Sequence, residues 1–94
     1  MSWLSVFLRK DSVQAVLKAG ITILKAFIGK VGEDLQRIAQ QEVAEAQNLY
    51  ALGKIPDKRA YVQERLKARF PQIKEVFINH AIETAVIALL AAKK

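Results

Sequence analysis

The sequence predicts an all-α fold, in which one long amphipathic helix is followed by two shorter helices and the chains form an oligomerising helical assembly. Apolar residues recur at intervals of three and four over residues 12–52. The 94 residues include only four glycines and two prolines, which favours helix throughout. Gly53 and Pro71 stand where the long helix and the second helix are expected to end.

The longest predicted helix spans residues 12–52, with Asp11 or Ser12 as its N-cap. Its apolar residues follow the alternating four- and three-residue spacing of a heptad repeat, and the alternation by two that a strand needs is absent. Such a stripe has to be covered by another helix, from this chain or from a second copy. We therefore expect self-association along a seam made of Leu17, Ile21, Leu24, Ile28, Val31, Leu35 and Ile38.

Several features interrupt this long helix. Gly20 and Gly29 each cost about 1 kcal/mol relative to alanine in a helix interior, which favours close approach of another helix at these positions. Gly32, followed by two acidic residues, is where a break in the helix would fall. Beyond residue 38 the apolar stripe moves by one residue, so the second half of the helix is expected to pack inside the chain, through Ala39, Val43, Ala46 and Tyr50.

The first ten residues are apolar and end in two cations. The cations follow the apolar run, which is the reverse of a secretory signal. The spacing places the aromatic and leucine side chains on one or two helical turns. They form either a cap folded over the core or an anchor for a membrane interface or a partner's groove, and the residues concerned are Trp3, Leu4, Phe7 and Leu8.

A second helix is predicted over residues 57–69, after a connector that begins at Gly53. Val62, Leu66 and Phe70 form its apolar side. The rest of its surface is a basic face that could bind phosphate groups, although such a charge run is more often solvated; it consists of Lys58, Arg59, Arg65, Lys67 and Arg69.

A third helix is predicted over residues 72–92. It has no charge between Thr84 and Ala92, and its apolar residues point all round the helix. This pattern indicates burial on several sides, or contact with another subunit or a membrane. A helix this apolar is a poor DNA-reading helix, so nucleic acid is an unlikely partner.

Composition and charge exclude several functional classes. The chain has no cysteine and a single histidine, His80, with no carboxylate cluster beside it, so we expect no catalytic site, metal or cofactor. The net charge of +6 would suit anionic lipid, nucleic acid or an acidic protein surface. Residues 13–32 contain three lysines, which argues against a transmembrane helix there.

The run KIPDKRAYVQERLKARFPQIKEVFINHAIETAVIAL resembles the soluble C-terminal portion of bacteriophage holins of the LL-H type. Members of that family begin with a transmembrane helix, and residues 13–32 depart from that pattern by their lysines. The resemblance implies phage origin. It is carried by Gly53, Lys58, Tyr61, Leu66, Phe70, Pro71, Ile82, Glu83, Ala85 and Val86.

From these observations we expect a non-enzymatic, phage-derived structural or assembly protein that works by helix packing in a multi-subunit complex, such as a virion. Its partners would be further copies of itself or other phage structural proteins, in the virion or the host cell interior. The alternative is a holin-like lysis protein peripheral to the host inner membrane, in which residues 3–27 engage an anionic bilayer. Binding to the phosphate backbone of nucleic acid is a weaker alternative.

Overall fold

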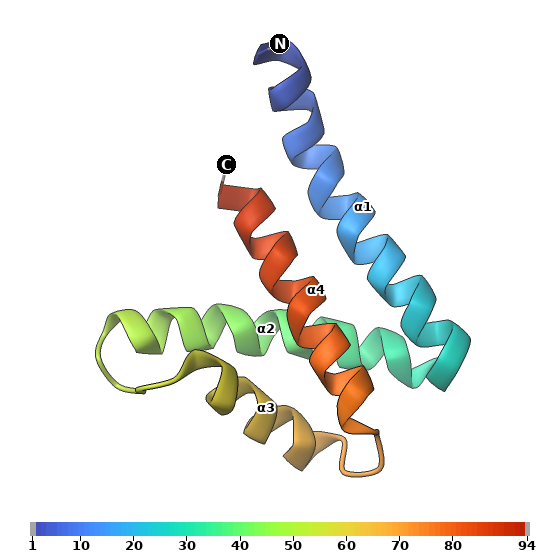
Figure 1. Ribbon diagram of the computed structural model, residues 1–94, viewed down its shortest axis with the longest axis vertical. Coiled ribbons are helices and arrows are strands. Elements are labelled where there is room, and N and C mark those ends of the chain that lie inside the picture. The colour runs from blue at the N-terminus through green and yellow to red at the C-terminus, as the bar shows by residue number, and fades with distance from the viewer. Residues whose placement is uncertain (1, 94) are drawn as a thin grey trace.

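The computed structural model describes the backbone of residues 2–93 and the side chains of residues 14–92. It contains four helices, α1 (Ser2–Ile28), α2 (Val31–Ala51), α3 (Lys58–Arg69) and α4 (Glu75–Lys93), and no strand in the described part of the chain (Figure 1). The predicted all-α class is confirmed. The prediction of one continuous helix over residues 12–52 is wrong, because α1 ends and α2 begins inside that range.

The break between α1 and α2 falls at Gly29, three residues before the expected position. Gly29 has a φ of 70°, a left-handed conformation that glycine adopts without steric cost. Its N–H donates to the carbonyl of Lys25 at 3.0 Å, and its own carbonyl accepts from the N–H of Gly32 at 2.9 Å. This is the usual way for a glycine to end a helix. The chain therefore changes direction here, and both halves of the apolar stripe can face one core.

Helix α4 lies at the centre of the fold and packs against the other three helices. It runs antiparallel to α1 and crosses α2, while α2 and α3 diverge from the connection at the opposite end of α2 (Figure 1). A Cβ atom on Gly20 would lie 2.5 Å from Cγ2 of Thr84, so the missing side chain lets α1 approach α4 closely. Farther along, the ring centroids of Phe27 and Phe77 are 5.7 Å apart.

The other helix ends have local causes. Gly53, with a φ of 74°, follows the end of α2. The carboxylate of Asp57 accepts a hydrogen bond from the N–H of Ala60 at 3.0 Å and caps α3, whose predicted bounds were 57–69. Helix α4 begins at Glu75, three residues later than expected.

The core is formed by apolar side chains from all four helices. It includes side chains with no exposed surface at Leu24 of α1, Leu35 of α2 and Leu66 of α3. A polar contact crosses it, because Gln36 Nε2 donates to the carbonyl of Ala81 at 3.1 Å. Burial of this apolar surface is the main force holding the helices together. The buried apolar cluster comprises Leu24, Leu35, Ile38, Ala39, Val43, Ala46, Val62, Leu66, Ile78, Ala81, Ile82 and Ala85.

Three of the seven residues of the predicted oligomerisation seam belong to this core and are not available to a partner, and the seam stays a prediction for the other four. The turn at Gly29 divides the seam between α1 and α2. Leu24, Leu35 and Ile38 are buried within the chain, and the other four members are half-buried. The chain itself covers the stripe in part, because α1 and α2 both pack against α4. The four half-buried members are Leu17, Ile21, Ile28 and Val31.

The molecule is flat, measuring 44 × 37 × 15 Å along its principal axes. In so thin an arrangement the central helix cannot be surrounded by neighbours. One side of α4 therefore remains at the surface, and its residues decide what that surface can bind.

Candidate functional site

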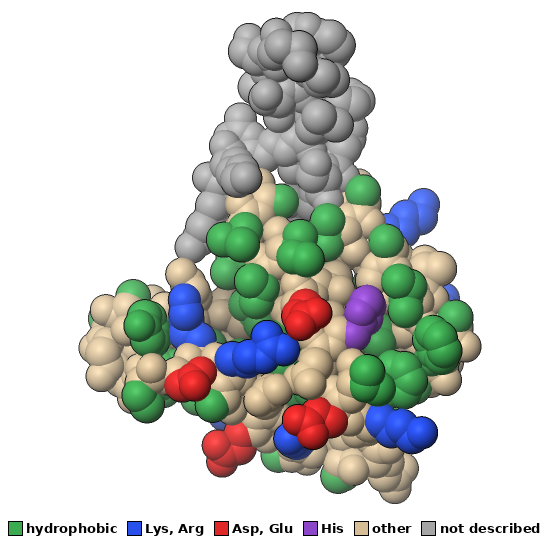
Figure 2. Space-filling model, viewed as in Figure 1, with side chains coloured by type: hydrophobic (Ala, Val, Ile, Leu, Met, Phe, Trp, Pro, Cys, Tyr) green, Lys and Arg blue, Asp and Glu red, His purple; other side chains and the backbone are tan. Residues whose placement is uncertain are grey.

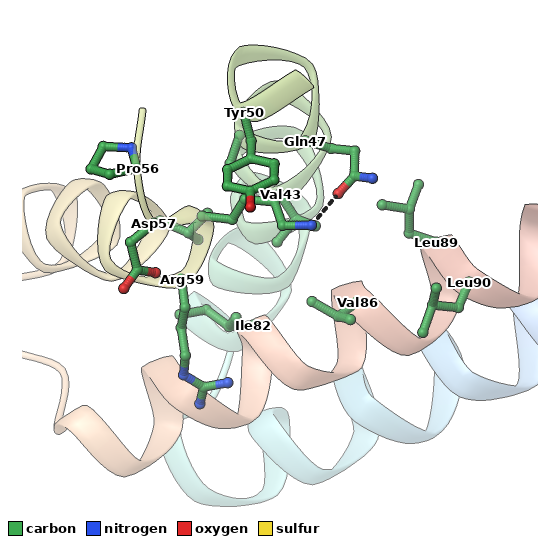
Figure 3. A pocket seen from close by; sticks show the side chains of 13 residues that line it. Val43, Gln47, Tyr50, Pro56, Asp57, Arg59, Ile82, Val86, Leu89 and Leu90 are labelled. Carbon is green, nitrogen blue, oxygen red and sulfur yellow. Dashed lines mark hydrogen bonds between the residues drawn. The ribbon is translucent and has the colours of Figure 1, made fainter. Parts of the chain in front are cut away.

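A groove of about 450 Å³ lies where the C-terminal half of α2, the start of α3 and the C-terminal half of α4 meet (Figure 3). Tyr50, Val86 and Leu90 form its open sides and are 49%, 39% and 56% exposed. Its floor consists of buried apolar side chains, which are Val43, Ala46, Val62 and Ile82.

The rim of the groove carries charged groups. The Lys58 ammonium donates to Gln47 Oε1 at 3.1 Å, which is the dashed contact in Figure 3, and lies 4.9 Å from the centroid of the Tyr50 ring. The nearby carboxylate of Asp57 is already bound to the N–H of Ala60 as the cap of α3. Lys58 forms no ion pair with any described carboxylate, so its positive charge is uncompensated at the mouth of the groove.

The outer side of α4 forms a second apolar surface. Val76, Glu83, Ile87 and Leu90 follow one another at intervals of seven, four and three residues and share one line along the helix, here called the outer stripe. Its three apolar members are 63%, 52% and 56% exposed. In Figure 2, hydrophobic side chains are concentrated over α4 and the adjoining edge of α1, and most charged side chains lie over α2 and α3.

Helix α1 extends this surface with Ile23 and Phe27, which are 45% and 70% exposed. Residues Glu75–Ala92 are long and apolar enough to cross a membrane, and 33% of them are buried within the chain. The core helix of a soluble protein meets the same criteria of length and composition. The feature that distinguishes α4 is that much of its apolar surface lies outside the core.

The predicted basic face is tied to the rest of the fold. Arg65 Nε lies 2.6 Å from Oε1 of Glu42, whose side chain is only 5% exposed, and this contact raises the pKa of Arg65 above its ordinary value. Arg59 pairs with Glu83 at 3.4 Å. Lys67 pairs with Glu75 at 3.2 Å, and Lys58 contacts the amide of Gln47. Lys58 and Arg69 are therefore the two members that form no ion pair with a described carboxylate.

These pairs change how the basic face is understood. Four of its five cations bind side chains of α2 or α4, so they attach α3 to its neighbours. Glu42 of α2 is the buried partner in this set, because the residue is only 4% exposed and lies against Arg65. Phosphate binding would have to compete with these contacts.

The other residues named in the sequence analysis lie at the N-terminus and at His80, and they add no comparable set of contacts among the described side chains. The side chains of Trp3, Leu4, Phe7 and Leu8 lie outside the described residues. His80 is half-buried, and its Nε2 is buried with no hydrogen-bond partner among the described groups. No cluster of three or more His, Asp or Glu side chains that could hold a metal ion occurs in the described part of the chain.

Sequence reasoning missed the groove because its walls come from three helices that are distant in the sequence. The one signal that pointed toward it was the uncharged segment Thr84–Ala92, whose apolar residues surround the helix. That segment supplies Val86, Leu89 and Leu90 to the groove. The sequence alone does not show which α4 residues face the core and which remain accessible.

Comparison of the chain with protein-family models, with curated proteins and with solved structures gives no match. The resemblance to LL-H type holins therefore rests on the residues quoted above. The functional assignment depends on the surface of the molecule.

Proposed function

We propose that this protein is a non-enzymatic, phage-derived structural or assembly protein whose subunits pack through the outer stripe of α4. The observation that carries this proposal is the exposure of Val76, Ile87 and Leu90 on a helix whose other side is built into the core. Exposed apolar area on this scale marks interaction surfaces. We therefore place the proposed subunit interface on the outer stripe and not on the seam of residues 17–38, because the outer stripe is accessible in the folded chain.

The partner that best fits the outer stripe is a second copy of the same chain, related by a two-fold axis. Val76 and Leu90 lie seven residues on either side of Glu83. If two α4 helices pack antiparallel about Glu83, Val76 of each copy meets Leu90 of the other. Glu83 already pairs with Arg59 at 3.4 Å, so each copy brings a compensating cation to the centre of the interface. Such self-complementarity is what a two-fold interface requires.

Analytical ultracentrifugation of the full chain tests this proposal. Wild-type protein is expected to sediment as a dimer or larger species, and Leu90→Glu is expected to shift it to monomer because a carboxylate would be buried in the interface. Leu52→Glu is the matched control, since Leu52 is 62% exposed and follows α2 away from the outer stripe. A wild-type chain that remains monomeric at high micromolar concentration contradicts the proposal.

Membrane association is the second candidate, and the corner at the α1–α2 turn favours it. Phe27 is 70% exposed and Val76 63% exposed, beside the half-buried Phe77. Lys30 and Lys74 are exposed at the adjoining helix ends and form no ion pair with a described carboxylate. Aromatic side chains flanked by lysines are typical of proteins that bind the interface of anionic bilayers.

Flotation with vesicles that contain anionic lipid separates the two candidates. For a membrane protein, Phe27→Ala, or Trp3→Ala combined with Phe7→Ala, should reduce the fraction that floats. Ile55→Ala, in the connector between α2 and α3, is the control. If the intact protein does not float at all, the membrane candidate is removed and the assembly proposal is unaffected.

A further inference from the structure

We infer that the groove between α2, α3 and α4 is a binding site for an anionic amphiphile, a single aliphatic chain that ends in a carboxylate or phosphate. This inference does not rest on the proposed function, because the groove is complete within one chain. It assigns a ligand class to a cavity whose floor is the accessible edge of the core and which shares only Leu90 with the outer stripe.

The shape and lining of the groove favour an aliphatic chain. Its volume of about 450 Å³ lies within the range of roughly 300–1,000 Å³ that is usual for small-molecule sites. The floor residues offer only methyl and methylene groups to an occupant, and each is less than one-tenth exposed. A polar ligand would lose its hydration against these walls with no hydrogen bond in return. The floor consists of Val43, Ala46, Val62 and Ile82.

The charge at the mouth favours an anionic head group. The Lys58 ammonium can donate three hydrogen bonds and gives one to Gln47 Oε1, while the Tyr50 ring lies 4.9 Å away. Asp57 is engaged at the start of α3, and Arg59 is held by Glu83. Among the described lining cations, Lys58 is therefore the one without a carboxylate partner, and a carboxylate or phosphate would complete its contacts.

The contact between Lys58 and Gln47 also favours a narrow occupant over a helix of a second subunit. It joins α3 to α2 at the groove (Figure 3). A docking helix would have to separate these two side chains before its own could reach the floor. An aliphatic chain can lie along the floor while its head group meets Lys58 at the rim. The sides that remain open to it are formed by Tyr50, Val86 and Leu90.

Isothermal titration calorimetry of the full chain provides the first test, with each ligand kept below its critical micelle concentration. Dodecanoate and dodecyl phosphate are expected to bind at one molecule per chain, and comparing them shows whether a fatty acid or a lipid phosphate fits better. Dodecyltrimethylammonium, which has the same tail and the opposite charge, is expected to bind at least about tenfold more weakly. Equal binding of the cationic ligand overturns the inference.

Two pairs of variants locate the site. Val86→Trp fills the groove and should weaken dodecanoate binding by at least about tenfold, whereas Leu52→Trp, at an exposed position outside both the groove and the outer stripe, should not. Lys58→Gln should weaken the anionic ligands by about tenfold, and Lys54→Gln, which removes the same charge outside the groove, should have little effect. Equal losses within either pair mean nonspecific attraction to a basic surface and contradict the inference.

NMR of the wild-type chain gives a result that does not depend on how the variants fold. Dodecanoate should shift the methyl resonances of Val43, Val62 and Ile82 and leave those of Leu24 and Leu35 unchanged. Shifts confined to Val76 or Ile87 would place the ligand on the outer stripe and overturn the assignment to the groove. The assembly proposal is tested separately by sedimentation without ligand.

Discussion

Helices α1 and α3 both pack against α2 and α4, but they do so by different kinds of contact. On the α1 side the contacts are mainly apolar and close, with Gly20 against Thr84 and the Phe27 ring beside Phe77. The ion pair described there, Lys25 with Glu33 at 3.4 Å, joins two side chains that are about half exposed. On the α3 side, Val62 and Leu66 reach the core, and ion pairs and hydrogen bonds surround them. These polar contacts include one of 2.6 Å between Gln63 Nε2 and Asn79 Oδ1.

The difference shows that a basic helix can use its charges inside the fold. The cations of α3 outnumber its anions, and in the sequence they look like a surface for phosphate. In the structure most of them reach acidic or amide side chains of α2 and α4. The cations that remain without a described carboxylate partner therefore include only two from α3, Lys58 and Arg69, beside others such as Lys30 and Lys74.

Removing an apolar contact on the α1 side is expected to lower the free energy of unfolding more than any other change proposed here. Leu24→Ala should lower the free energy of unfolding by about 2–5 kcal/mol, because the side chain has no exposed surface and its removal leaves a cavity. Ile23→Ala, next to it and 45% exposed, should cost less than about 1 kcal/mol. Equilibrium urea unfolding measures both, and equal losses would show that α1 is not packed as described.

The corresponding change on the α3 side is Arg65→Ala. We expect a smaller loss of unfolding free energy than for Leu24→Ala, because Glu42 would lose its partner while the guanidinium is already half-exposed and solvent screens its charge. Adding Glu42→Gln to this variant should recover part of the loss, since the unpaired buried charge is then gone. Arg69→Ala is the control and should change the unfolding free energy by about 0.5 kcal/mol or less. If Arg65→Ala is equally neutral, α3 is held by its apolar residues alone.

The variant Gly20→Ala tests how closely α1 packs against α4. The new Cβ would meet Thr84 Cγ2 at 2.5 Å, so the helices must separate or Thr84 must move. A loss of about 1–3 kcal/mol is expected in thermal or urea unfolding, although alanine is the better helix former. The double variant with Thr84→Ala should be more stable than Gly20→Ala alone. A stabilised single variant would contradict the close approach.

The smallest expected effect is a pH dependence on the α3 side. Burial raises the pKa of Tyr61 above its ordinary value of 10.0, and the neighbouring Arg65 charge opposes this shift. The folded state therefore holds the phenol proton more tightly than the unfolded state. The resulting stability is present below pH 10 and is lost as the pH rises through the higher folded-state pKa. Tyr61→Phe should flatten this alkaline decline relative to Tyr50→Phe. Identical curves would show that Tyr61 is not the cause.

Much of the helical structure could be predicted from local signals. Apolar spacing indicated helices, Gly53 and Asp57 marked the end of α2 and the start of α3, and Pro71 marked the connection before α4. The break at Gly29 was missed because the three- and four-residue spacing continues across it without interruption. A helix ended by a left-handed glycine and a second helix that starts two residues later can preserve the same spacing.

The candidate sites were less predictable for a related reason. The uncharged end of α4 indicated burial or association. It did not show which side of the helix packs into the core and which side remains available to a partner. The groove needs Tyr50 from α2, Lys58 from α3 and Val86 from α4, and no interval in the sequence relates these residues to one another.

By itself, the sequence determined that the chain is helical, where α3 lies and that the C-terminal part of α4, Thr84–Ala92, is apolar on all sides. These properties depend on residues within a few positions of one another. The tertiary structure decided that the stripe from Leu17 to Ile38 is divided between two helices and that Leu24, Leu35 and Ile38 are buried within the chain. It also decided that Arg59, Arg65 and Lys67 bind inside the fold, and that the outer stripe and the groove remain accessible. Burial depends on which helices meet, and helical periodicity does not specify that.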